Sequence, residues 1–132
     1  MVVLPASTDF SECAINTINQ LYVLDEEQAC IYVFDELLFL REVIKTIETT
    51  TGKVELRAPK HLCIDRFNNL YVYDSKVGAI IKKPVKGDAL LIGQAGWGVG
   101  ELGDVKDIAV DSKGLCYVLN RSRNVVDVYS PD

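Results

Sequence analysis

The sequence predicts an all-β fold made of a repeated antiparallel sheet, and two observations support this prediction. First, the segments Cys13–Asp25, Leu62–Asp74 and Ile108–Asn120 align with one another without a gap. Second, each segment contains two short runs of apolar, aromatic and β-branched residues on either side of a turn-forming stretch, which is the pattern of a β-hairpin. The repeat returns after 49 residues and then after 46, counted between the equivalent positions Leu21, Leu70 and Cys116. Periods of this length are typical of the blades of β-propellers.

The first strand of each unit ends at a residue whose short polar side chain can accept hydrogen bonds from the backbone two residues further on, namely Asn16, Asp65 or Asp111. The turn that follows contains residues that tolerate left-handed backbone angles, namely Asn19, Asn68-Asn69 or Gly114. Turn formation explains both the type and the place of the three polar residues, so we interpret them as turn residues. A carboxylate cluster for a cation at one end of a channel is the alternative.

The second strand carries Leu-Tyr-Val in two units and Cys-Tyr-Val in the third, and it closes at Asp25, Asp74 or Asn120. A polar loop then leads to a third strand, predicted at 30–34, 79–83 and 125–129. A fourth strand is predicted at 89–92 in the second unit and within 38–47 in the first. Apolar residues from 37 to 47 also recur at helical spacing, so a helix is the alternative there.

We therefore predict one domain, residues 1–132, of about three β-propeller blades, each a four-stranded antiparallel sheet. The units span roughly 9–57, 58–104 and 105–132, with 1–8 as a possible closing strand. Propellers close with roughly four to eight blades, so this chain supplies only part of a ring.

An open arc would expose sheet edges and an apolar face, and this invites pairing with another chain. We hypothesise that two copies assemble head to tail into a homodimer with a complete six-bladed ring. Met1–Leu4 would then supply the fourth strand that the last unit lacks, either within its own chain or in the partner. The alternatives are a fragment of a longer propeller and one subunit of a hetero-complex.

The third unit resembles the repeats of NHL-repeat propellers. Its sequence Ile108-Ala-Val-Asp-Ser-Lys-Gly-Leu-Cys-Tyr-Val-Leu-Asn120 follows a glycine-rich stretch from Gly93 to Gly103, and Pro59 and Val105 occupy matching positions ahead of their repeats. The resemblance covers roughly residues 9–132, although asparagines replace the usual turn glycine in the first two units. It implies a scaffold that most often binds proteins, sometimes binds RNA or carbohydrate, and in a few members catalyses a reaction.

Composition and charge narrow the classes of partner. The formal charge of −5 and the scattered Lys and Arg disfavour nucleic-acid binding, because neutralising phosphates is its main source of affinity. No apolar run is long enough to cross a bilayer, and Met1–Phe10 lacks the pattern of a signal peptide, so no membrane partner is expected. The cysteines form no Cys-x-x-Cys pair and are interpreted as four small buried thiols, Cys13, Cys30, Cys63 and Cys116. A cytoplasmic location is favoured on these grounds.

No catalytic, cofactor-binding or metal-binding set is predicted. Gly98–Gly103 has the glycine spacing of a dinucleotide-binding turn, but the sequence after it indicates a strand where that turn needs a helix. His61 is the only histidine, and we expect it in a loop or at a strand edge. Trp97 is interpreted as a plug between blades, and a partner anchor is the alternative.

Possible partner-binding residues lie mainly in the loops between the second and third strands, where an acidic first loop would neighbour a basic third loop across a dimer joint. The candidates are Trp97, Glu26, Glu27, Lys76, Arg121 and Arg123. The predicted function is a non-catalytic scaffold or binding module that mediates protein–protein interaction and self-assembles into a ring. The alternative is an enzyme or metal-binding propeller with its site at the central channel.

Overall fold

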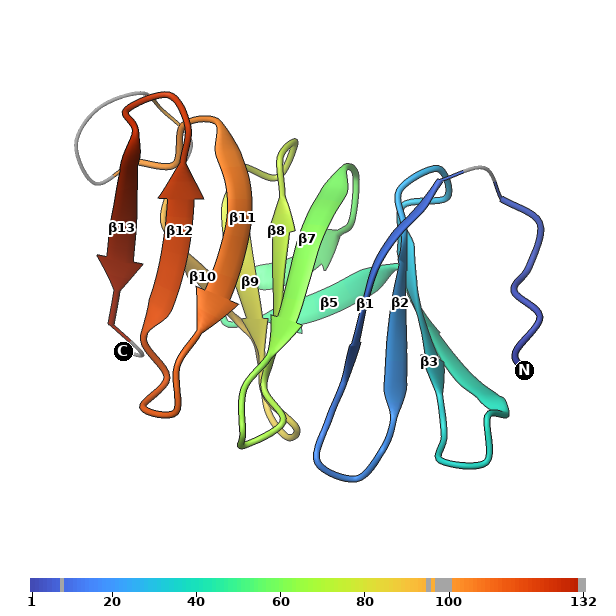
Figure 1. Ribbon diagram of the computed structural model, residues 1–132. Helices are drawn as coiled ribbons and strands as arrows, with labels where there is room; N and C mark the ends of the chain where they lie inside the picture. Colours follow the sequence, from blue (N-terminus) through green and yellow to red (C-terminus); the bar gives the residue numbers. More distant parts are fainter. Residues whose placement is uncertain (8, 95, 97–100, 131–132) are drawn as a thin grey trace.

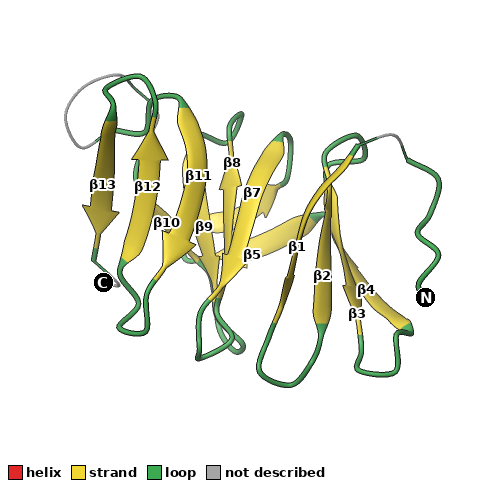
Figure 2. Cartoon of the chain, viewed as in Figure 1, coloured by secondary structure: helices red, strands yellow, loops and turns green. Residues whose placement is uncertain are grey.

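The computed structural model describes residues 1–7, 9–94, 96 and 101–130, and this part of the chain is all-β. Its main elements are three antiparallel sheets that follow one another along the chain (Figures 1 and 2). No described segment is a helix with the length and apolar character needed to cross a bilayer.

The three sheets have the same strand order as their sequence. The first contains β1 (Phe10–Ile15), β2 (Leu21–Asp25), β3 (Cys30–Phe34) and β4 (Leu40–Ile44). The second contains β7 (Pro59–Ile64), β8 (Leu70–Asp74), β9 (Ala79–Lys83) and β10 (Leu90–Ile92). The third contains β11 (Val105–Val110), β12 (Cys116–Asn120) and β13 (Val125–Tyr129). The strands predicted within 38–47 and 89–92 are confirmed as β4 and β10, and the helical alternative for 37–47 is wrong.

A two-stranded hairpin between the first and second sheets was not predicted. It consists of β5 (Thr46–Thr49) and β6 (Gly52–Glu55), and it buries Ile47 and Leu56 in the core between those sheets. Two backbone hydrogen bonds attach it to the end of the second sheet: Ala89 N donates to Glu48 O at 2.8 Å, and Thr50 N donates to Ala89 O at 3.1 Å. The hairpin therefore bridges the first and second sheets, across the place where they pack on each other.

The turns follow the chemistry predicted for them. Asn19, Asn68 and Gly114 have φ angles of 61°, 67° and 87°, in the left-handed region. Because asparagine and glycine tolerate this region better than other residues, the same turn forms in all three units. Thr17 in the first turn also donates its backbone N–H to the Asn68 side chain at 2.9 Å, which joins two of these turns.

The sheets pack on one another through opposite faces. We call the front face of a sheet the one that carries the first and third residues of its second strand, such as Leu70 and Val72, and the other the back face. The back face of the first sheet packs on the front face of the second, in a core that includes Leu24, Ile31, Val72 and Ile81. The back face of the second sheet packs on the front face of the third, in a core that includes Tyr71, Ile80, Ile108 and Val118. The chain thus makes the same back-to-front joint twice.

The two ends of the chain lie on opposite sides of the molecule (Figure 1). Residues 1–7 form no strand, and Val2 and Leu4 pack against apolar residues on the front face of the first sheet. In the described part of the chain, no fourth strand pairs with β13. The closing strand is therefore not formed within the single chain.

Candidate functional site

The first strands of the three sheets meet along one side of the molecule, where β7 contacts both β1 and β11. Each of these strands has a register irregularity before its third residue, and the third residues are Glu12, His61 and Asp107. Such β-bulges re-aim the side chain next to them. The result is a cluster of one imidazole and two carboxylates, one from each sheet, whose ligand atoms all lie within 4.8 Å of one another.

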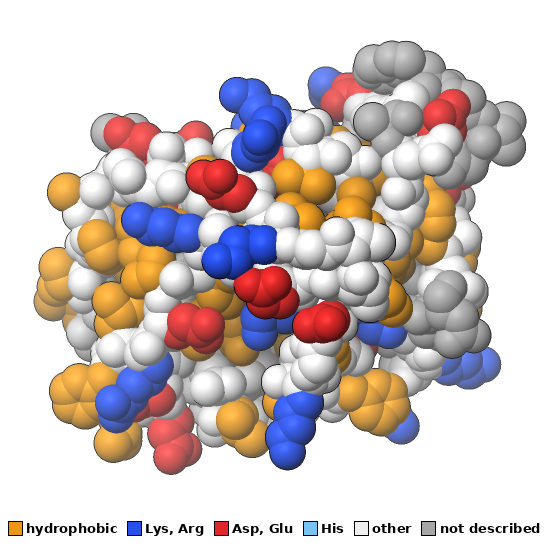
Figure 3. Space-filling view, turned by 180° about the vertical axis from the view of Figure 1, so that it is seen from behind, with side chains coloured by type: hydrophobic (Ala, Val, Ile, Leu, Met, Phe, Trp, Pro, Cys, Tyr) orange, Lys and Arg blue, Asp and Glu red, His pale blue; other side chains and the backbone are white. Residues whose placement is uncertain are grey.

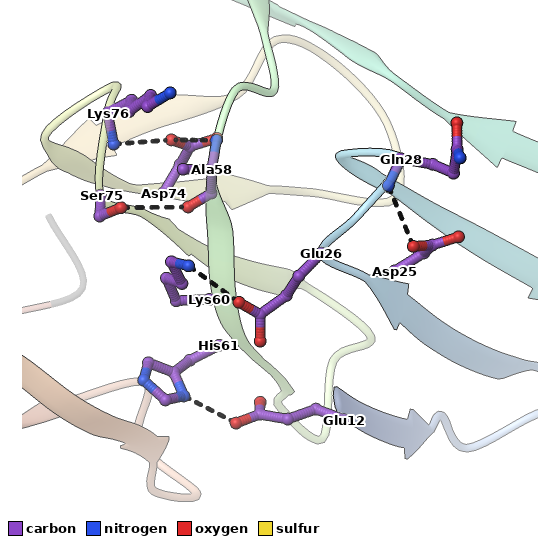
Figure 4. Close-up of polar contacts among 10 residues, drawn as sticks. All are labelled: Glu12, Asp25, Glu26, Gln28, Ala58, Lys60, His61, Asp74, Ser75 and Lys76. Carbon is purple, nitrogen blue, oxygen red and sulfur yellow. Dashed lines mark hydrogen bonds and ion pairs between the residues drawn. The ribbon is translucent and has the colours of Figure 1, made fainter. Parts of the chain in front are cut away.

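Distances within the cluster are short. His61 Nδ1 lies 2.6 Å from Glu12 Oε2 and 3.9 Å from Asp107 Oδ1 (Figure 4 shows the His61–Glu12 contact). The side chains of His61 and Glu12 are largely buried, at 18% and 28% exposure, whereas Asp107 is 67% exposed. The cluster is therefore open to solvent on the side of Asp107.

Neighbouring groups hold the three side chains in place. Leu62 N donates to Glu12 Oε1 at 2.9 Å, which leaves Oε2 for His61. The His61 ring stacks on Tyr73, with centroids 6.2 Å apart and planes 18° apart. Ile108 N donates to Asp107 Oδ1 at 2.8 Å. An arrangement of one nitrogen and two carboxylate ligands is able to bind a divalent cation.

His61 lies in β7, an edge strand of the second sheet, so the prediction of a strand-edge residue is confirmed. Sequence reasoning did not find the cluster around it. The signal was present, because Glu12, His61 and Asp107 occupy the same column of the repeat, immediately before the aligned residues Cys13, Leu62 and Ile108. The three residue types differ, however, and the column does not look repeated.

The predicted partner-binding loops lie at one end of the sheets, at the top of Figure 1, which we call the upper rim. Glu26 pairs with Lys60 of the second sheet, with Lys60 Nζ 2.9 Å from Glu26 Oε1 (Figure 4), and Ser7 Oγ donates to Glu27 Oε2 at 3.0 Å. Lys76 is exposed in the β8–β9 turn.

The basic residues of the third loop pair with acidic residues in or next to their own sheet. Arg121 Nε lies 2.9 Å from Asp104 Oδ2, and Arg123 Nη2 lies 2.6 Å from Asp127 Oδ2. Trp97 falls outside the described residues, as do Gly98 and Gly100 of the glycine-rich motif. The strand β11 follows that motif, as predicted, and no helix begins there.

Asn16, Asp65 and Asp111 do not converge on a cation site. The Oδ1 atom of each accepts two backbone N–H groups of its own turn, at 2.8 to 3.1 Å. Burial opposes ionisation of Asp65, but hydrogen bonds from Asn69, Tyr71 and Phe67 outweigh it, and the pKa of Asp65 is lowered. The pKa of Asp111 is lowered in the same way, with burial opposed by Leu115, Tyr117 and Lys113. Turn formation is therefore confirmed for these residues.

The cysteines correct one prediction. All four are free and all lie in strands, but only Cys30 and Cys116 are buried, whereas Cys63 is half-buried and Cys13 is exposed. Cys13 lies on the front face of the first sheet, where no preceding sheet covers it, and this explains its exposure.

Two sheet faces at opposite ends of the chain are not covered by another described sheet. On the front face of the first sheet is a groove of about 450 Å³, and its lining includes Val2, Leu4, Phe10, Cys13 and Leu21. On the back face of the third sheet, the exposed apolar residues are Leu119, Val126 and Val128.

The outer edge of the first sheet is also apolar. The β3–β4 turn and the start of β4 expose Leu37, Leu38, Phe39 and Leu40. Figure 3, seen from behind, shows hydrophobic side chains gathered toward the side of the first sheet and charged side chains across the middle.

Taken by its architecture, the described chain is an all-β protein of repeated antiparallel sheets, compatible with a β-propeller-like fold. Comparison of the sequence with protein-family models and with curated proteins found no match. The resemblance to NHL-repeat propellers thus rests on the repeat residues alone, and membership of that family stays a prediction.

Proposed function

We propose that this protein is a non-catalytic scaffold of the β-propeller type that self-assembles through its two uncovered sheet faces. The observation that carries the proposal is that back-face positions buried in the two internal joints are exposed on the third sheet, and that Cys13 on the front face of the first sheet is exposed where its equivalents are covered. A face that is apolar in every repeat and uncovered in only one is typical of an interaction surface.

The back face of the third sheet makes this comparison directly. Leu119, Val126 and Val128 are 44%, 55% and 53% exposed. The residues at the same positions of the first sheet, which pack on the second sheet, are exposed by no more than 3%: Leu24, Ile31 and Val33.

The front face of the first sheet shows the complementary difference. Cys13 is exposed there, whereas its equivalents Leu62 and Ile108 are each 6% exposed because the preceding sheet covers them. The third sheet of one copy would cover this face of a second copy with the joint that the chain already uses twice. We infer that the partner is a second copy of this chain.

Head-to-tail contact of this kind closes when two chains contribute three units each, within the usual size of a propeller. In such a ring, Met1–Leu4 of each copy would leave the front face of its own first sheet and pair with the open edge of β13 in the partner. This move would supply the missing fourth strand and free the groove for the neighbouring sheet. The upper rim, with Glu26, Lys76 and Arg121, would remain available to other proteins.

Analytical ultracentrifugation of the full chain at micromolar concentration tests the proposal, and we expect twice the mass of one chain. Val126→Glu would place a charge on the apolar back face of the third sheet, and we expect it to return the protein to the monomer. Because Val126 is largely exposed in the single chain, the variant should fold normally. Val85→Glu is the matched control, since Val85 is 65% exposed but lies between β9 and β10, away from both faces.

Cys13 gives a second readout, because assembly would bury it. Its reaction with a thiol reagent should be slow in the wild-type dimer and fast in Val126→Glu. A wild-type chain that stays monomeric, or a Val126→Glu variant that assembles as well as Val85→Glu, would contradict the proposal.

A further inference from the structure

We propose that Glu12, His61 and Asp107 form a binding site for a divalent transition-metal ion of the zinc class. This site goes beyond the proposed scaffold function and does not depend on it, because all three ligands come from one chain. Each is the third residue of a first strand, so the site lies where the three sheets meet.

The geometry is close to that of a bound ion. Bonds of about 2.0–2.1 Å around a tetrahedral zinc place ligand atoms about 3.3 Å apart. The distances from His61 Nδ1 to Glu12 Oε2 and Asp107 Oδ1, 2.6 and 3.9 Å, lie on either side of this value. The ligand atoms of Glu12 and Asp107 also lie within 4.8 Å of each other, so side-chain rotations of His61, Glu12 and Asp107 would bring all three atoms to the spacing of a bound ion.

The chemistry of the ligand set selects the ion. Calcium and magnesium prefer shells made of oxygen, whereas an imidazole nitrogen suits zinc and its neighbours. With a neutral imidazole, the two carboxylates supply a charge of about −2, which balances the divalent ion. On binding, the metal would replace the hydrogen bond between His61 Nδ1 and Glu12 Oε2, because Nδ1 binds a metal only through its free lone pair.

The surroundings favour a prepared site. The Leu62 N–H fixes the second oxygen of Glu12, and Tyr73 stacks on the His61 ring, so two of the three ligands are held without the metal. Asp107 is exposed and stands on the side where the site is open to solvent. Three protein ligands leave at least one coordination position for water or another small ligand.

The experiment measures Zn²⁺ binding to the tag-free full chain by competition with a chromophoric chelator. A Cys13→Ser background removes the exposed thiol, which is a possible zinc ligand of its own. We expect one Zn²⁺ per chain with saturable binding. His61 is the only histidine, so its ring resonances in an NMR spectrum should shift on saturation and report this residue alone.

Three variants separate a metal site from a structural contact. His61→Asn keeps a donor near the place of Nδ1 for Glu12 but removes the nitrogen ligand, and we expect binding to weaken about a hundredfold. Asp107→Asn should weaken it about tenfold or more without affecting the fold, because Asp107 is exposed. Glu48→Gln removes the same charge from an exposed carboxylate of β5 and should leave the affinity unchanged.

Absence of saturable binding at about 1 mM Zn²⁺ would overturn the proposal. So would unchanged affinity in His61→Asn, or His61 resonances that do not move. In those cases the Glu12–His61 contact is only a hydrogen bond that joins the first and second sheets.

Discussion

The carboxylate of Asp74 holds the entry to the second sheet together, and its removal should be among the most destabilising single changes in this chain. Asp74 is fully buried. Its two oxygens accept four backbone N–H groups at 2.7 to 3.1 Å: those of Arg57 and Ala58 before β7, and those of Lys76 and Val77 in the β8–β9 turn. Figure 4 shows the bonds from Ala58 and Lys76.

A hydrogen bond to a charged acceptor contributes about 1.5–3 kcal/mol, and bonds that share one acceptor group do not add fully. The N–H groups of the turn can turn toward water, whereas those before β7 are less free to do so. We therefore expect Asp74→Ala to lower the free energy of unfolding by about 3–5 kcal/mol.

Asp74→Asn tests the reasoning more finely. The third sheet has asparagine at this position, but there the Asn120 amide donates to Glu101 O and Asp127 Oδ2. At position 74 the NH₂ group of an asparagine would face backbone N–H donors and could not accept from them. We therefore expect Asp74→Asn to keep about half of the hydrogen bonds to this side chain and to lower the free energy of unfolding by about 2 kcal/mol.

Urea denaturation followed by circular dichroism measures these differences, with Asp88→Ala, an exposed carboxylate of the β9–β10 connection, as the control. The free energy of unfolding of the control should stay within about 0.5 kcal/mol of the wild-type value. If Asp74→Ala lowers the free energy of unfolding by less than about 1 kcal/mol, the four backbone N–H groups have other partners and the reasoning fails.

Three further predictions concern side chains of the repeats. The pKa values of Asp65 and Asp111 are lowered by folding, so the stability that these carboxylates contribute is present above their unfolded pKa of about 3.9 and is lost as the pH falls through the lower folded values. Unfolding free energies measured from pH 7 to the acid range should decline below about pH 4, and less steeply in Asp65→Asn; a stability that rises on acidification would exclude this linkage. Tyr71→Phe removes the bond from a fully buried hydroxyl to Asp65 Oδ2 and should cost about 1–2 kcal/mol in thermal unfolding, more than the equivalent change in the less buried Tyr117. Burial raises the pKa of Cys63 to about 12, so a thiol reagent at pH 8 should label Cys13 first in the monomeric Val126→Glu variant, and equal labelling of both would show that the sheets open readily.

The repeats made most of the fold predictable. Turn residues such as Asp65 and Asn68 have a local physical role, so their pattern indicates hairpins without knowledge of the rest of the chain. The strands that follow these turns form where the runs of apolar, aromatic and β-branched residues predict them. The β4 strand was harder, because its residues fit two periods and only pairing with β3 decides between them.

Other features depend on contacts between units and leave little local signal. The β5–β6 hairpin lies in a stretch of threonines and charged residues, and its place is fixed by Ile47 and by the bonds to Ala89. The exposure of Cys13 follows from its being in the first sheet, since an equivalent residue in the second would be covered. The cluster around His61 brings together residues about fifty positions apart, and only the packing of three strands shows it.

The β5–β6 hairpin makes the two joints of the chain unequal in resistance to opening. It closes the outer side of the first joint, and Ile47 of the hairpin joins the core there. Leu56, which follows the hairpin, has its counterpart in Leu102 between the second and third sheets. Cooperative units of different strength exchange their amide protons at different rates. The first two sheets should therefore behave as one slowly exchanging body, while the third detaches from it early during unfolding and exchanges sooner.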